Sequence, residues 1–139
     1  EGSAFHCSLG LDGRALAEGK FQLTEDGSAL QYSLIVHGVG DITMAHLHLG
    51  SAGEIGSPVA WLYPKGPPPK LIPGFFEGVL ARGAVTEDDL VGPFRGRPLS
   101  SLIEAIRSGR IYVNVHTKMH ARGEICGPVD LSEEMQRIE

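Results

Sequence analysis

Apolar and polar side chains alternate most regularly along residues 111–116. The β-branched residues are Ile111, Val113 and Val115. The residues between them are polar or aromatic: Tyr112, Asn114 and His116. Successive side chains of a strand point to opposite faces of a sheet, so the stretch predicts a strand with one apolar face. The opposite face carries Asn114 and His116. This pattern predicts a fold that contains a sheet with one apolar face and one polar face.

A second stretch, Met-Ala-His-Leu-His-Leu-Gly, begins at Met44 and has the same period of two. His46 and His48 share one face of the predicted strand, and the alanine and leucines between them share the other. If this strand and the strand that ends at His116 are neighbours, three imidazoles meet on one face. The two stretches are therefore the first candidates for a site.

Composition favours an all-β chain around these two strands. The 139 residues include 19 glycines and 9 prolines without a fixed period, which indicates many turns and short strands. One amphipathic helix is expected before the 111–116 strand, because apolar residues recur at helical spacing: Leu99, Leu102, Ile103 and Ile106. Ser101 and Glu104 are spaced as a capping box, and Gly109 is placed to end the helix.

The remaining strands are expected at 5–11, 20–24, 29–36, 58–63, 75–85 and 124–129. A hairpin turn is expected at 25–28, and a second turn at 38–41 should separate the 29–36 strand from the strand with His46. The length and a hydrophobic content of 42% suit one domain over residues 1–139, with its core at about 5–129 and a tail at 130–139.

Charge and motif content argue against several classes of function. A net charge of −5 disfavours nucleic acid and anionic lipid as main partners, and no apolar run is long enough to span a membrane. The chain has no Gly-x-Ser-x-Gly elbow and no phosphate-binding loop. The first three residues lack the basic and apolar regions of a signal peptide, which leaves open whether one has been removed.

Two cysteines, Cys7 and Cys126, lie near opposite ends of the chain, and neither has a Cys-x-x-Cys partner. In an oxidising compartment we expect a disulfide between them, because it would tie the first strand to the last. Two buried free thiols are the alternative.

The histidines predict a mononuclear metal site formed by His46, His48, His116 and His120. Imidazole suits copper and zinc better than calcium or magnesium, and copper is preferred to zinc because Met44 and Met119 offer thioethers nearby. The alternative is that the histidines only stabilise strands and the methionines only pack.

Three polar residues are expected to support the ligands rather than to bind the metal. Glu124 would orient a ligand histidine through its second ring nitrogen, although direct coordination by its carboxylate stays open. Asn114 and Thr117 are expected to donate or accept supporting hydrogen bonds.

The two blocks resemble a known family. Residues 45–50 read Ala-His-Leu-His-Leu-Gly, followed by Gly53 and by Gly-Ser-Pro-Val at 56–59. Residues 102–117 end in Tyr-Val-Asn-Val-His-Thr, followed by Gly-Glu-Ile at 123–125. Both blocks are similar to those of CHRD domains, the module named after chordin. The chain departs from the usual pattern at His120, which adds an imidazole, and at Cys126, which makes the expected disulfide particular to this protein.

The resemblance implies an antiparallel, Greek-key-like β-sandwich and an exported protein, periplasmic or secreted, but no single activity. Three hypotheses follow: a copper-binding domain with a carrier, storage or redox role, a copper enzyme similar to superoxide dismutase, or a metal-free structural or interaction module. For the enzyme, Lys118, Arg122 and Arg110 would draw an anion such as superoxide towards the metal.

Overall fold

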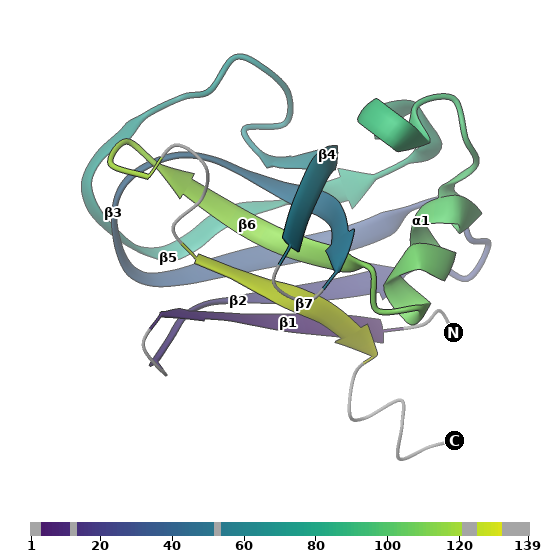
Figure 1. Ribbon diagram of the computed structural model, residues 1–139, viewed down its shortest axis with the longest axis horizontal. Helices are drawn as coiled ribbons and strands as arrows, with labels where there is room; N and C mark the ends of the chain where they lie inside the picture. Colours follow the sequence, from purple (N-terminus) through teal and green to yellow (C-terminus); the bar gives the residue numbers. More distant parts are fainter. Residues whose placement is uncertain (1–3, 12–13, 52–53, 121–124, 132–139) are drawn as a thin grey trace.

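The computed structural model describes residues 4–11, 14–51, 54–120 and 125–131 (Figure 1). The strands are β1 (Ala4–Leu11), β2 (Arg14–Leu23), β3 (Leu30–Ser51), β4 (Glu54–Tyr63), β5 (Ile72–Val85), β6 (Ile111–Thr117) and β7 (Ile125–Leu131). Two single-turn 3₁₀ helices, η1 (Glu87–Asp89) and η2 (Gly92–Phe94), precede the helix α1 (Leu99–Arg107). The all-β prediction with one helix before the 111–116 strand is confirmed.

The described strands pair antiparallel in the order β2, β1, β7, β6, β3, and β3 also pairs with β2. These five strands therefore close into a barrel, and β4 and β5 extend the sheet from β3. The antiparallel sheet agrees with the prediction, whereas the expected two-layer sandwich is not confirmed. Barrel closure removes sheet edges that a sandwich would leave open.

One long strand, β3, makes the closure possible. The sequence predicts a turn at 38–41 that divides this region into two strands, but the structure has a single strand from Leu30 to Ser51. Gly38 and Asp41 have positive φ angles of 79° and 54°, and the ladder to β5 shifts register at the same place. The chain bends there without leaving the sheet. As a result the first half of β3 pairs with β2 and the second half pairs with β6.

Alternate residues of the five barrel strands fill the interior. The buried set shares one face of the continuous ladder: Phe5, Cys7, Ala17, Phe21, Tyr32, Leu34, Val36, Ala45, Leu47, Val113, Val115 and Val129. Tyr32 donates its buried hydroxyl to the Leu62 carbonyl oxygen at 2.9 Å, so its polar atom is satisfied. His46 and His48 belong to the other set of alternate residues and therefore face outward from the barrel.

The helix α1 lies at one end of the barrel (Figure 1). The four apolar residues of the predicted stripe are all buried, together with Ala105. The helix begins at Leu99, with Pro98 as its N-cap, so the capping box expected at Ser101 is not used. Gly109 has a φ of 75° just after the helix and ends it as predicted.

The disulfide expectation is corrected, because Cys7 and Cys126 are both free thiols. Cys7 faces the barrel interior, where it lies opposite Val129 on β7, whereas Cys126 is exposed and lies opposite Gly10 on β1. The two side chains therefore point to opposite faces of the same pair of strands, and they cannot bond to each other. Burial raises the pKa of the Cys7 thiol to about 12.

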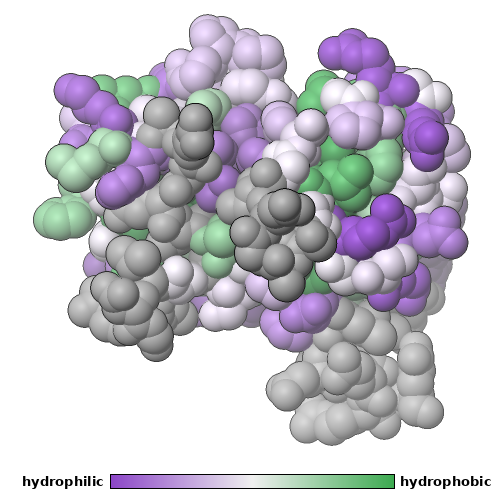
Figure 2. Space-filling model, in the orientation of Figure 1, coloured by the Kyte–Doolittle hydropathy of each residue, from purple (hydrophilic) through white to green (hydrophobic). Residues whose placement is uncertain are grey.

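The described surface is largely hydrophilic or neutral in the view of Figure 2, and the hydrophobic residues form small groups there. Within the described ranges, no helix has the length and apolar character needed to cross a membrane.

Candidate metal centre

The regular ladder between β3 and β6 brings the two predicted histidine stretches together. Met44 lies opposite His116, His46 opposite Asn114 and His48 opposite Tyr112. Directly opposite residues of antiparallel strands point to the same face, so the three histidines share the outer face of the barrel. The condition set by the sequence, that these two strands are neighbours, is met.

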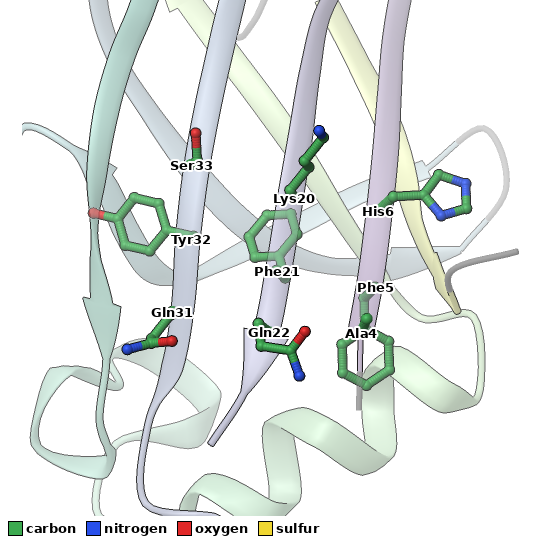
Figure 3. A pocket seen from close by; sticks show the side chains of 9 residues that line it. All are labelled: Ala4, Phe5, His6, Lys20, Phe21, Gln22, Gln31, Tyr32 and Ser33. Carbon is green, nitrogen blue, oxygen red and sulfur yellow. The ribbon is translucent and has the colours of Figure 1, made fainter. Parts of the chain in front are cut away.

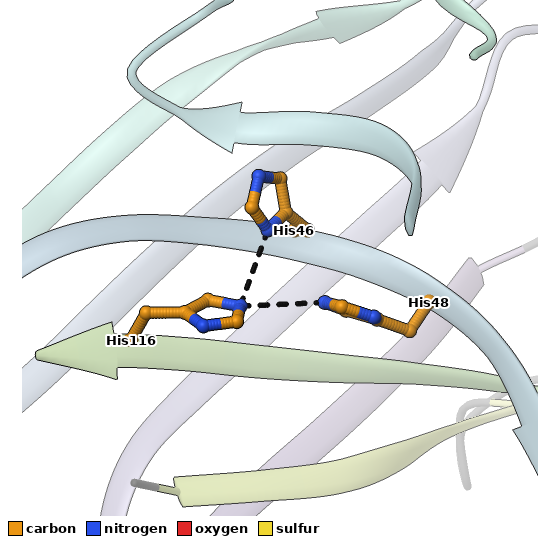
Figure 4. Close-up of side chains that lie close together, drawn as sticks. All are labelled: His46, His48 and His116. Carbon is orange, nitrogen blue, oxygen red and sulfur yellow. Dashed lines mark hydrogen bonds between the residues drawn. The ribbon is translucent and has the colours of Figure 1, made fainter. Parts of the chain in front are cut away.

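The three imidazoles form a compact group (Figure 4). Nδ1 of His46 lies 3.2 Å from Nε2 of His116, and this Nε2 lies 3.4 Å from Nε2 of His48. All three residues are buried, with exposed fractions of 4% to 5%. The group is therefore shielded from bulk water, although its residues alternate with those of the hydrophobic interior.

A carbonyl oxygen from β4 fixes the tautomer of His48. Nδ1 of His48 donates to the Gly56 carbonyl oxygen at 2.9 Å, so in the neutral ring Nε2 keeps its lone pair. A Cβ at position 56 would lie 2.2 Å from the Leu49 carbonyl oxygen, which only glycine avoids. Gly56 therefore lets β4 approach closely enough to orient the histidine.

The central nitrogens cannot all be satisfied by hydrogen bonds among themselves. His116 Nε2 faces both His46 Nδ1 and His48 Nε2, but a neutral imidazole carries only one hydrogen. If Nε2 of His116 lacks the hydrogen, it faces the lone pair of His48 Nε2, and if it carries the hydrogen, that one hydrogen must serve both neighbours. A single cation that accepts three lone pairs removes this conflict, so the group has the donor set of a metal site.

The spacing agrees with ligands around one ion. Metal–nitrogen bonds of about 2.0–2.1 Å at a tetrahedral angle place neighbouring nitrogens about 3.3–3.4 Å apart. The two contacts of His116 Nε2, at 3.2 Å and 3.4 Å, match this separation, and the donor atoms of the three residues all lie within 4.8 Å of one another. The described residues contribute three imidazoles and no carboxylate to the group.

Burial favours the neutral form of two of the three imidazoles, His46 and His48. Burial, together with the neighbouring His116 and His48, lowers the pKa of His46 to about 3. Burial also lowers the pKa of His48, although the Gly56 carbonyl opposes the shift. Metals bind the neutral imidazole, so these two rings need not lose a proton to bind one near neutral pH.

Trp61 on β4 packs against the site and was not predicted from the sequence. Its ring centroid lies 4.3 Å from that of His46, with an angle of 88° between the two ring planes. Trp61 also lies opposite His46 in the ladder between β3 and β4. The predicted strand at 58–63 already contained it, but no local pattern reveals which residue of β4 lies opposite a histidine.

The structure does not bring His120 into the group. Its side chain is exposed in the turn after β6. The backbone amide of Thr117 donates to the His120 carbonyl oxygen at 3.2 Å, and the His120 amide donates to the Thr117 hydroxyl at 3.1 Å. These bonds close the turn on itself, and the group that the described residues form contains three of the four histidines of the predicted site.

The methionines and supporting residues predicted for the site differ in burial and position. Met119 is 84% exposed, whereas Met44 is half-buried and lies opposite His116 in the ladder. Asn114 and Thr117 are both buried, but only Asn114 lies opposite His46 on the outer face, whereas Thr117 belongs to the other set of alternate residues of β6. Glu124 lies outside the described residues. Of the two methionines, only Met44 lies next to the histidines in the structure.

The two remaining histidines are far from this chemistry. His37 pairs with Glu18 at 2.9 Å on the surface. His6 lines an open pocket of about 430 Å³ across β1, β2 and β3, where its neighbours include Lys20, Gln31 and Ser33 (Figure 3). No second histidine lines that pocket, so it lacks the donor set of the β3–β6 group.

The sequence blocks that supply these ligands agree with a family-wide pattern. The model of the CHRD domain matches residues 10–129, which is most of the chain. The chain belongs to the CHRD domain family. No curated protein sequence and no solved structure is significantly similar to this CHRD domain. CHRD domains occur in extracellular proteins in general.

Proposed function

We propose that this CHRD domain binds one transition-metal ion, copper in preference to zinc, through Nδ1 of His46 and Nε2 of His48 and His116. The observation that carries the proposal is the convergence of three buried imidazole nitrogens at 3.2 Å and 3.4 Å. Without an ion, the two contacts cannot both be well-aligned hydrogen bonds, because Nε2 of His48 carries no hydrogen and Nε2 of His116 carries at most one. The function is binding, storage or delivery of the ion outside the cytoplasm.

The donor set supports copper over harder cations. Imidazole nitrogen is a borderline ligand that suits copper and zinc, and the described site offers no carboxylate oxygen for calcium or magnesium. Met44 lies opposite His116 and gives the site a thioether neighbour, which favours copper(I). A buried site without acidic ligands also favours the ion of lower charge.

Metal loading of the purified, metal-free protein tests the proposal. The protein is incubated with copper or zinc, desalted, and assayed for retained metal. We expect one copper per chain, with nitrogen hyperfine structure in the copper(II) resonance spectrum. His116→Ala should abolish retention, and His37→Ala, whose side chain lies on the surface, should not. An intact protein that retains no copper, or a His116→Ala variant that retains it fully, would contradict the proposal.

A second candidate is a copper enzyme that consumes superoxide. It is favoured by one observation: three protein ligands leave a coordination position for a small exogenous molecule. Two superoxide ions and two protons would yield one dioxygen and one hydrogen peroxide as the copper alternates between two oxidation states. Superoxide consumption that does not exceed that of an equal amount of free copper would leave the binding role alone. A chain that retains no metal would instead be an interaction module.

A further inference from the structure

The strand β4 meets the histidines differently from β6. The ladder to β6 is regular from Met44 to Leu49, whereas the ladder to β4 shifts register between Ala45 and His46, and again on both sides of His48. β-Bulges of this kind re-aim side chains and are frequent beside functional sites. The irregular pairing therefore places β4 where it can orient individual rings.

One histidine already has its orienting partner on β4. His48 donates from Nδ1 to the Gly56 carbonyl oxygen, which leaves Nε2 to face the centre. Ligand histidines usually donate their second nitrogen in this way, because the bond fixes both tautomer and ring angle. To bind the proposed ion through Nδ1, which faces the centre, His46 needs the opposite tautomer, with its hydrogen on Nε2.

The Nε2 atom of His46 is buried and has no hydrogen-bond partner among the described residues. A buried N–H group without an acceptor is unfavourable. The indole of Trp61 packs against this imidazole in a T-shaped arrangement, with the ring planes at 88° and the centroids 4.3 Å apart. The face of an aromatic ring carries negative potential and accepts N–H groups weakly.

We propose that Trp61 is a positioning residue of the metal site: its indole face accepts the Nε2–H group of His46 and holds the tautomer that ligates through Nδ1. This inference rests on the proposed function. β4 then orients two of the three ligands in opposite tautomers, His48 through a backbone carbonyl and His46 through an aromatic face.

The tautomer of His46 is the direct test. Long-range proton–nitrogen correlation spectra of the protein loaded with copper(I) distinguish a hydrogen on Nε2 from one on Nδ1. We expect the His46 proton on Nε2, shifted upfield by the ring current of Trp61. A hydrogen on Nδ1 of His46, or an Nε2 proton without the upfield shift, would overturn the proposal.

Two substitutions separate the aromatic face from simple packing. Trp61→Phe keeps a π face, and Trp61→Leu keeps only an apolar side chain. Loss of an orienting partner typically weakens metal affinity about 10–100-fold, and we expect Trp61→Leu to lie near 10-fold because the contact is weak. Trp61→Phe should recover most of that affinity. Tyr63→Leu on the same strand is the matched control and should bind as the wild type does.

The outcomes distinguish the two proposals. A wild-type protein that retains no copper overturns the metal site itself. A wild-type protein that binds copper while Trp61→Leu binds equally well overturns only the role of Trp61. Equal losses in Trp61→Leu and Trp61→Phe, or in Trp61→Leu and Tyr63→Leu, would also overturn it, because packing would then explain the effect. If Trp61→Leu fails to fold, Trp61→Phe and the wild-type spectrum still decide.

Discussion

The two faces of the ladder between β3 and β6 use alternate residues of the same strands for different purposes. Ala45 and Leu47 fill the barrel interior, and His46 and His48 converge with His116 on the outer face. Both faces are buried, so burial alone does not distinguish hydrophobic core from site. The difference lies in whether the buried atoms need partners. Carbon atoms do not, and imidazole nitrogens do.

The largest expected effect is loss of the metal from the outer face. His116→Ala removes the ligand that contacts both other rings, and copper affinity should fall by more than about 100-fold, beyond the usual effect of an orienting partner. His120→Ala is the matched control, four residues further along, and should bind normally. Competition with a chelator of known affinity measures both. Equal losses in the two variants would restore the four-histidine site.

A substitution on the inner face should act on stability instead. Leu47 is fully buried, and Leu47→Ala should lower the free energy of unfolding by about 2–5 kcal/mol. Leu71→Ala, at a position that is 43% exposed, should change it by less than about 0.5 kcal/mol. Denaturant unfolding measures these changes. Both variants should still bind one copper per chain at low denaturant, and a Leu47→Ala variant that folds but loses the metal would contradict the separation of faces.

Acid should lower the free energy of unfolding of the metal-free protein, because His46 on the outer face is held neutral in the folded state. The folded pKa of His46 is lowered from 6.5 to about 3, so the unfolded chain takes up the proton first. Stability from the neutral ring is therefore present above about pH 6.5 and is lost as the pH falls towards 3. We expect unfolding to become easier between pH 7 and pH 5, above the range in which carboxyl groups titrate.

His46→Asn removes this titration and is the comparison for the acid experiment. The slope of unfolding free energy against pH between 7 and 5 should be shallower in the variant than in the wild type, with both proteins metal-free. Identical slopes would mean that the outer-face histidine does not contribute to the pH dependence.

The smallest effect is expected from the cysteines. Cys7 faces inward and Cys126 outward, so reducing agent should leave the free energy of unfolding unchanged within about 0.5 kcal/mol, whereas loss of a native disulfide typically costs about 2–5 kcal/mol. A thiol reagent should label Cys126 and leave the buried Cys7 unmodified in the folded protein. Mass spectrometry of labelled peptides checks this, and a bridged peptide would contradict it.

Much of the site was predictable because strand alternation is local. The period of two along residues 44–50 and 111–116 assigned each histidine to a face, and the structure brings His46, His48 and His116 together on that face. The stripe from Leu99 to Ile106 likewise predicted the helix that the structure contains. These patterns depend only on side chains a few residues apart.

Other features depended on contacts that no local pattern encodes. The turn expected at 38–41 is a bend within β3, because neighbouring strands keep pairing along it. His120 has the right spacing to approach His116, but hydrogen bonds with Thr117 close its turn away from the site. Trp61 carried no signal in the sequence because its role depends on the register of β4.

The sequence by itself therefore determined the family, the all-β character, the helix and the face that each histidine occupies, since these follow from motifs and short periods. Tertiary structure alone decided the closed barrel, the group of three histidines, the separation of the two cysteines and the contact of Trp61 with His46. The physical reason is that strand register, bends and bulges are set by pairing between segments far apart in the chain. Only that pairing determines which groups lie next to each buried imidazole nitrogen.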